Sequence, residues 1–134
     1  MVVASPDARG ATEPAAVSDP DSAPLPPEIE ELFDDANGDL ALGELDSAAE
    51  KYLRCTELAP ECFDAWHALE MALMKLGRID EAIAAGKRTV ELRPNDQLAW
   101  SSLSLCYVRA GNIAEAEAAG AKARILGWGG RIKK

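Results

Sequence analysis

From residue 29 onward, apolar residues recur at the three- and four-residue spacing of an amphipathic helix, and the whole pattern repeats every 34 residues. Alanine is abundant and no run of alternating β-branched residues occurs, which favours helices throughout. The clearest positions that keep the 34-residue step are Gly43, Gly77 and Gly111, then Ala48, Ala82 and Ala116, and then Leu58, Leu92 and Leu126. A period of this size is typical of a solenoid, in which one supersecondary unit is stacked repeatedly.

The repeated glycines divide each unit into two helices. Each of them follows an apolar residue or alanine, which suits a glycine that ends a helix in the left-handed conformation. Asp46 and Asp80 then fall at the beginning of the next helix, where a negative charge is favourable. The pattern predicts six helices in three antiparallel pairs: residues 29–42 with 46–58, 63–76 with 80–92, and 97–110 with 114–126.

Residues 1–28 have a different composition, rich in alanine, proline, serine and acidic residues. The prolines that oppose a regular helix there are Pro6, Pro14, Pro20, Pro24, Pro26 and Pro27. A segment with almost no large apolar residues cannot offset the entropy lost on ordering, so we expect residues 1–28 to be a disordered tail. Residues 131–134 form a short basic C-terminal tail.

Charge is divided unequally along the chain. Residues 1–62 hold 15 acidic against 3 basic side chains, a net charge of −12, whereas residues 63–134 hold 8 against 11, a net charge of +3. This distribution argues against nucleic-acid binding, which needs a dense basic face. It suits either a solvated acidic half or attraction of that half to a basic surface. The sequence shows no secretory signal and no apolar run that could span or insert into a membrane, so we expect a soluble, cytoplasmic protein.

The residue types that carry metal or catalytic chemistry are sparse. Cys55 and Cys62 are seven residues apart, and His67 is the only histidine, so we expect no metal site, no disulfide framework and no cofactor. Cys55 and Cys106 are expected to be small apolar core residues. No nucleophile or paired acid can be placed beside His67, which predicts that the protein is not an enzyme. An acidic cluster without the glycine and distal glutamate of a calcium loop is interpreted as a solvated face: Asp34, Asp35 and Asp39.

The arrangement resembles the tetratricopeptide repeat, a 34-residue helix–turn–helix unit. The family pattern is Trp-x-x-Leu-Gly-x-x-Tyr, followed by alanine, a bulky aromatic residue, a second alanine and proline. The matching residues are Ala36, Ala48, Tyr52 and Pro60 in the first unit, Trp66, Leu69, Leu73, Ala82 and Pro94 in the second, and Trp100, Leu103, Tyr107, Ala116 and Ala123 in the third. The resemblance implies an all-α, right-handed α-solenoid with repeats at 29–62, 63–96 and 97–130.

The departures from the pattern also carry information. Gly86 and Gly120 replace the bulky residue of the second helix, which permits closer packing at a cost on the order of 1 kcal/mol each in helix propensity. Asp35 and Asp39 occupy positions that are normally apolar, so the first helix is expected to be the least stable and to act as an N-terminal cap.

The third unit ends with Trp128, flanked by glycines, where the pattern has proline. We expect this tryptophan to fold back over the last helix pair as a cap. The alternative is an exposed apolar edge that promotes self-association.

In this family the first helix of each pair lines a concave groove. Helical spacing from the tryptophan position predicts nine groove residues: Phe33, Asn37, Leu40, His67, Met71, Met74, Ser101, Leu105 and Val108. Six of the nine are apolar, which favours a trough for a peptide segment of another protein. A shallow groove whose residues mainly pack on their neighbours is the alternative. Lys75 and Arg109 lie only beside the stripe, so a clamp for a C-terminal carboxylate is not expected.

The expected function is a protein–protein interaction module that works as an adaptor, scaffold or assembly chaperone. The alternative is a self-associating structural module, in which the acidic N-terminal helix pair of one copy meets the basic end of the next. The basic residues of that end are Arg124, Arg131, Lys133 and Lys134.

Overall fold

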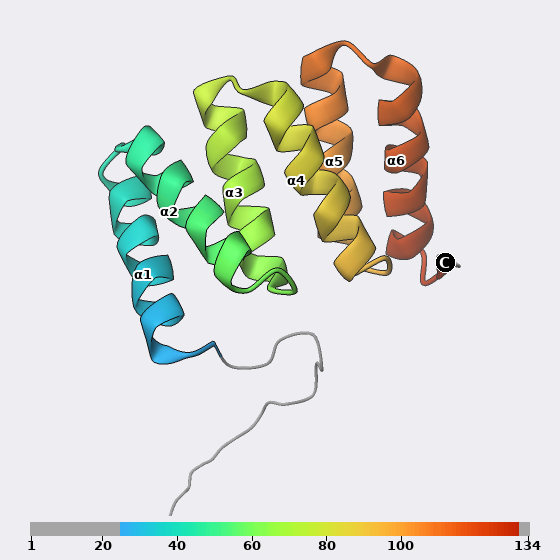
Figure 1. The fold of residues 1–134 in the computed structure, drawn as a ribbon. Coiled ribbons are helices and arrows are strands. Elements are labelled where there is room, and N and C mark those ends of the chain that lie inside the picture. The colour runs from blue at the N-terminus through green and yellow to red at the C-terminus, as the bar shows by residue number, and fades with distance from the viewer. Residues whose placement is uncertain (1–24, 132–134) are drawn as a thin grey trace, which may run out of the picture.

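The structure is a computed structural model that describes residues 25–131. Within this range the chain forms six α-helices, each packed against the next in a row (Figure 1). They are α1 (Pro27–Ala41), α2 (Leu45–Leu58), α3 (Phe63–Leu76), α4 (Ile79–Leu92), α5 (Gln97–Ala110) and α6 (Ile113–Gly127). The predicted all-α architecture of three consecutive helix pairs is confirmed. The predictions made for residues 1–24 and 132–134 lie outside the described residues.

The helix boundaries differ from the expected ones mainly at the N-terminal ends. Helix α1 begins at Pro27, because proline is well tolerated in the first turn, where its missing N–H has no intrahelical partner. Leu25 packs with Ile29 and Cys55 in a small apolar cluster, so the expected disordered segment extended too far toward residue 28. The second helix of each pair begins one residue earlier than predicted, at Leu45, Ile79 and Ile113.

Glycines end the first helix of each pair as the sequence indicated. The φ angles of Gly43, Gly77 and Gly111 are 81°, 80° and 81°, in the left-handed region that side chains disfavour. After Gly77 the Arg78 N–H donates to the Leu73 carbonyl at 2.9 Å, which satisfies an orphan carbonyl of the helix end. These turns let the chain reverse within two or three residues.

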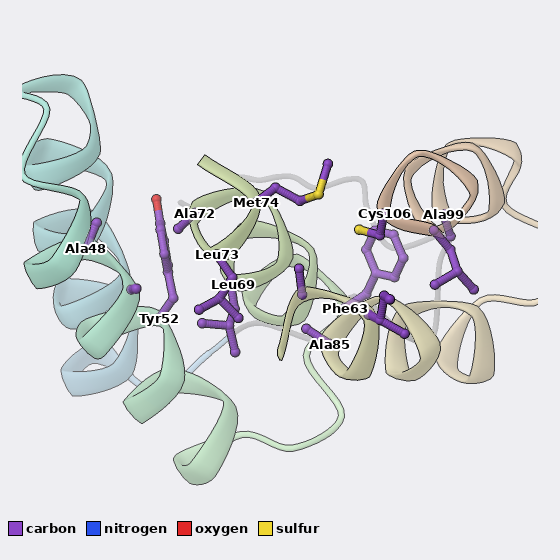
Figure 2. Close-up of a cluster of buried hydrophobic side chains, with 14 of the residues drawn as sticks. Ala48, Tyr52, Phe63, Leu69, Ala72, Leu73, Met74, Ala85, Ala99 and Cys106 are labelled. Carbon is purple, nitrogen blue, oxygen red and sulfur yellow. The ribbon is translucent and has the colours of Figure 1, made fainter. Parts of the chain in front are cut away.

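The core runs continuously from α1 to α5 (Figure 2). Ala48 and Ala82 are completely buried and let the two helices of their pairs approach closely. Large side chains, among them Tyr52, Phe63 and Leu69, fill the space between neighbouring helices. The hydroxyl of the fully buried Tyr52 donates to Asn37 Oδ1 at 2.6 Å, so its polar end is satisfied at the edge of the core.

Trp66 and Trp100 are half-buried and pack against the core, as expected of structural residues. Each indole N–H donates to the carbonyl of the proline six residues earlier, Pro60 or Pro94, at 2.8 Å. The tryptophan and proline of the repeat pattern therefore fasten the start of one helix pair to the turn that precedes it.

Asp39 does not belong to a solvated acidic face, contrary to the sequence interpretation. Its carboxylate accepts from Ser47 Oγ at 2.6 Å and lies 2.8 Å from Lys51 Nζ, and these two contacts hold its pKa below the usual value. The aspartate thus joins α1 to α2 through polar contacts, where the repeat pattern has an aromatic residue. Asp34 and Asp35 are exposed, as predicted.

Candidate protein-binding surfaces

The nine predicted groove residues lie on α1, α3 and α5 and are here called the groove stripe. On α1, Phe33 and Leu40 are half-buried and pack against the core, with the Phe33 ring 5.5 Å from that of Tyr52. Asn37 between them is exposed, and its Oδ1 atom is already engaged by Tyr52. The α1 part of the stripe is therefore largely devoted to packing.

The α3 part of the stripe is partly covered by α5. His67 Nε2 lies 3.2 Å from Ser102 Oγ, and its ring stacks on Phe63 with 5.7 Å between centroids. Burial lowers the pKa of His67, so the imidazole is neutral at physiological pH and serves as a polar packing contact. Met71 is half-buried. Met74 is only 5% exposed and lies in the core, so it does not line an open surface as expected.

The α5 part of the stripe is open. Leu105 and Val108 are 49% and 51% exposed, and Ser101 is exposed beside them. In the second pair, α5 partly covers the equivalent residues of α3. Within residues 25–131 no helix follows α6, so α5 has no such cover. The accessible apolar part of the stripe is therefore Met71, Leu105 and Val108.

A second hollow lies on the other side of α3, against α2 and α4, and is here called the α2–α4 pocket. Its volume is about 240 Å³. Its apolar wall consists of Leu53, Trp66, Leu69, Leu73 and Ala84, and its polar lining residues are Glu50, Arg78 and Glu81. Sequence reasoning did not predict this pocket, because it arises where three helices leave a gap rather than from one helical stripe.

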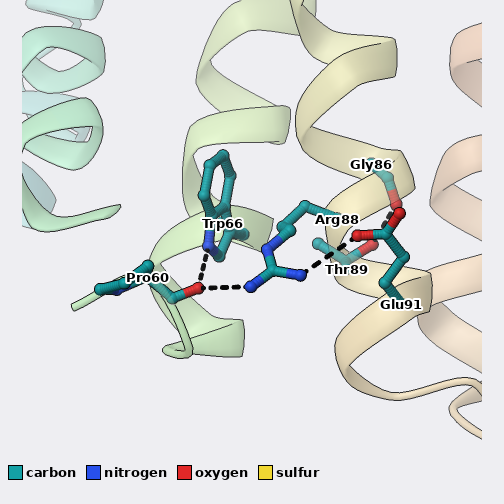
Figure 3. Close-up of polar contacts among 6 residues, drawn as sticks. All are labelled: Pro60, Trp66, Gly86, Arg88, Thr89 and Glu91. Atoms are coloured by element: carbon teal, nitrogen blue, oxygen red, sulfur yellow. Dashed lines mark hydrogen bonds and ion pairs between the residues drawn. The ribbon is translucent and has the colours of Figure 1, made fainter. Parts of the chain in front are cut away.

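Figure 3 shows the polar contacts around Trp66 and Arg88. In the third pair, Lys122 Nζ lies over the ring of Trp100, 4.5 Å from its centroid. Arg88 occupies the equivalent position in the second pair, 34 residues earlier. Its guanidinium instead donates to the Pro60 carbonyl at 3.3 Å and to Glu91 at 3.1 Å, so Trp66 has no such cover.

Trp128 does not fold back as a cap, contrary to expectation. It is 82% exposed at the end of α6. The chain turns sharply just after it, because Gly129 has a φ of 90° and the Gly130 N–H donates to the Ile125 carbonyl at 2.9 Å. This hydrogen bond closes the helix end in a Schellman arrangement.

The structure reveals a buried carboxylate that sequence reasoning missed. Glu70 on α3 is completely buried beside α4 and α5. Its Oε2 atom accepts from the Cys106 thiol at 3.3 Å, and its Oε1 atom has no hydrogen-bond partner. A Cβ atom added to Gly86 would lie 2.6 Å from Oε2, so this glycine leaves the space that the carboxylate fills.

Burial raises the pKa of Glu70 to about 7, and the thiol hydrogen bond opposes this rise only in part. The Cys106 thiol has a pKa raised to about 12, mainly by burial and by the neighbouring carboxylate, so it remains a donor. Both groups are sealed from solvent. The pair therefore affects the stability of the helix packing rather than chemistry on an external ligand.

Residues 25–131 also include the cysteines and the candidate metal ligands discussed above. All three cysteines are free, and Cys55 and Cys106 are buried, as predicted. In the described range, no group of three histidine, cysteine, aspartate or glutamate side chains is arranged to hold a metal ion. No helix of this part of the chain is long and apolar enough to cross a membrane.

The six helices, packed as three consecutive pairs, define the class of helix-pair repeat proteins. The tetratricopeptide repeat family matches residues 33–96 and 67–131, so most of the chain is covered. The chain belongs to the tetratricopeptide repeat family and is a protein-interaction module of that kind. No curated protein matches the sequence at a significant level.

Solved structures of similar fold extend this comparison. A structure of MamA, labelled AMB-1, is 27% identical with a TM-score of 0.73, over 78% of this chain and 57% of that one. The CopN–Scc3 complex gives 18% identity and a TM-score of 0.73, over 76% of this chain and 60% of that one. SycD, a type III secretion translocator chaperone of Yersinia enterocolitica, gives 19% identity and a TM-score of 0.70, over 76% of this chain and 77% of that one. The last two show the fold alone, and this chain spans little more than half of the MamA chain.

Proposed function

We propose that this protein binds a peptide segment of another protein along the open part of the groove stripe, as an adaptor, scaffold or assembly chaperone. The observation that carries the proposal is the exposure of Leu105 and Val108, each about half accessible, beside the half-buried Met71. Three apolar side chains on neighbouring helices form a surface that a monomeric protein gains nothing by exposing. Methionine adapts to partners of irregular shape.

The chemistry of the stripe narrows the type of peptide. His67 is neutral, and the amide of Asn37 carries no charge, so neither provides a cation for a terminal carboxylate. Lys75 and Arg109 are exposed at the margin, where they would meet acidic residues flanking an apolar segment. The expected ligand is a short apolar segment with acidic flanks. The relationship of fold to a secretion chaperone is compatible with this role but does not identify the partner.

The test is affinity capture from an extract of the source cells with the wild-type protein and a Met71→Glu, Leu105→Glu double variant. Charged side chains at these positions should weaken binding of an apolar segment at least tenfold, because each would be desolvated against the ligand. Circular dichroism establishes that both proteins are folded. Binding of a synthetic peptide from any captured protein is then measured by titration calorimetry.

A Leu42→Glu, Ile113→Glu variant provides the matched control. Both residues are exposed apolar side chains in or beside the turns, 78% and 54% accessible, and neither belongs to the groove stripe. This variant adds the same charge and should capture the same partner as the wild type. Equal capture by all three proteins would contradict groove binding.

Self-association is a second candidate function, and the exposed Trp128 favours it. Sequence alone pointed to acidic and basic ends that attract each other. The structure adds an apolar group, the indole of Trp128, at the basic end.

A further inference from the structure

We infer that Trp128 of one copy inserts into the α2–α4 pocket of a second copy, so that the chain associates end to side through a heterologous contact. The inference concerns the self-associating candidate function and uses neither Met71, Leu105 nor Val108. It therefore stands or fails separately from peptide binding along the groove stripe.

The size of the α2–α4 pocket suits one aromatic side chain. Its volume of about 240 Å³ corresponds to the space of roughly eight water molecules. Pockets for small molecules usually begin at about 300 Å³, so this one is better matched to a single protruding residue. Its wall already contains the Trp66 ring, and aromatic pairs gain from offset or edge-to-face contact.

Trp128 is presented in a way that favours insertion. The Schellman arrangement at Gly129 and Gly130 orders the backbone next to Trp128, so little further backbone order is lost on binding. Tryptophan and arginine are the residue types most enriched at the energetic centres of interfaces. An indole that is 82% exposed is a large apolar group with no cover within the described part of its own chain.

Charge complementarity selects a second copy as the occupant. Residues 122–134 carry five basic side chains and no acidic one: Lys122, Arg124, Arg131, Lys133 and Lys134. Among the side chains that line the α2–α4 pocket, Arg78 is the basic one, and its guanidinium donates two hydrogen bonds to Glu81. Two lining carboxylates, Glu50 and Glu81, against the one basic side chain give the pocket lining a net charge of −1. A basic end with a tryptophan therefore faces an apolar pocket whose lining is net negative.

The contact joins two different surfaces, so each copy retains one free pocket and one free tryptophan after pairing. Association then continues into chains or closes into a ring. This property gives the inference a specific test, because two variants that each lack one surface can still complement each other.

The experiment measures molar mass by light scattering and sedimentation velocity for the full chain over a concentration series. Trp128→Ala removes the inserted side chain. Ala84→Phe fills the pocket from within, at an exposed helical position where the fold should tolerate it. Each variant alone should raise the dissociation constant at least about thirtyfold, because loss of a central aromatic contact has that effect. Raising the salt concentration should weaken association of the wild type.

An equimolar mixture of Trp128→Ala and Ala84→Phe should form dimers and nothing larger, since only one competent pair of surfaces remains in each couple. Leu42→Ala, at an exposed apolar residue elsewhere, should associate like the wild type. A wild type that stays monomeric at every concentration would overturn the inference. So would association that persists unchanged in both variants, or a mixture that remains monomeric while the wild type associates.

Discussion

Replacing Glu70 with glutamine is expected to raise the free energy of unfolding by roughly 2–3 kcal/mol more at pH 8 than at pH 5. The reason is that Glu70 is completely buried, with one carboxylate oxygen unpaired and a thiol as the partner of the other. An ionised carboxylate in that position is removed from solvent, and this burial disfavours the charged form. Glutamine has the same shape and never becomes charged.

The direction follows from the pKa of the folded protein. Burial raises the pKa of Glu70 from 4.5 to about 7, so the folded state binds the proton more tightly than the unfolded state. The stabilisation from the protonated form is complete below pH 4.5, is lost as the pH rises toward 7, and is absent above that. Each unit of difference between the folded and unfolded pKa corresponds to about 1.4 kcal/mol. Groups with a lowered pKa, such as Asp39, change the stability with pH in the opposite direction. They do so equally in the wild type and the Glu70→Gln variant, so their effect cancels in the comparison.

Chemical denaturation of the wild type and the Glu70→Gln variant, followed by circular dichroism, gives the free energy of unfolding of each protein at pH 5 and pH 8. Glu31→Gln, which removes an exposed carboxylate from α1, should show a much smaller change between the two pH values. A Glu70→Gln effect of equal size at both pH values would mean that the pKa of Glu70 is the same in the folded and the unfolded protein. The proposed cause of the pH dependence would then be wrong.

The fold was predictable because the same local signals for helices and turns occur in each of the three repeats. Gly43, Gly77 and Gly111 each need the left-handed conformation, and the sequence marks them at equal steps. The groove stripe was harder to predict, because its accessibility depends on the neighbouring pair. Met74 and Val108 occupy equivalent positions, yet Met74 is 5% exposed and Val108 is 51% exposed. Helical periodicity cannot supply this difference, since it describes one helix at a time.

Two further features depended on three-dimensional packing. Trp128 was expected to cover the last helix pair, but the glycines on its C-terminal side close the helix end and leave the indole outside. The buried Glu70 was also missed, although a signal was present. The sequence has Leu69-Glu70 where the repeat pattern has leucine followed by glycine, and Gly86 where it has a bulky aromatic residue. The large and small members of a contact pair have been exchanged between α3 and α4.

This exchange predicts opposite effects of one substitution at two equivalent positions. Gly86→Ala should destabilise the protein by roughly 1–2 kcal/mol, because overpacking of a filled core exceeds the gain in helix propensity. The added methyl group would lie 2.6 Å from Glu70 Oε2 and 3.0 Å from Leu103 Cδ1. Gly120→Ala should stabilise it by roughly 0.5–1 kcal/mol, since the nearest atom, Ser104 Oγ, is at an ordinary contact distance of 3.4 Å. Denaturation of the two variants beside the wild type measures both changes.

The cause of the Gly86→Ala effect can be isolated in a Glu70→Ala background. With the carboxylate removed, Gly86→Ala should become neutral or stabilising, because the methyl group then enters vacated space and Leu103 can shift into the remainder. Gly120→Ala should keep its effect in that background, because its nearest neighbours are Ser104 and Arg124 rather than Glu70. If Gly86→Ala destabilises both backgrounds equally, the requirement for glycine lies in the approach of α4 to Leu103. If it stabilises both, the carboxylate moves aside at little cost, and the exchange of large and small residues does not constrain the packing of α3 against α4.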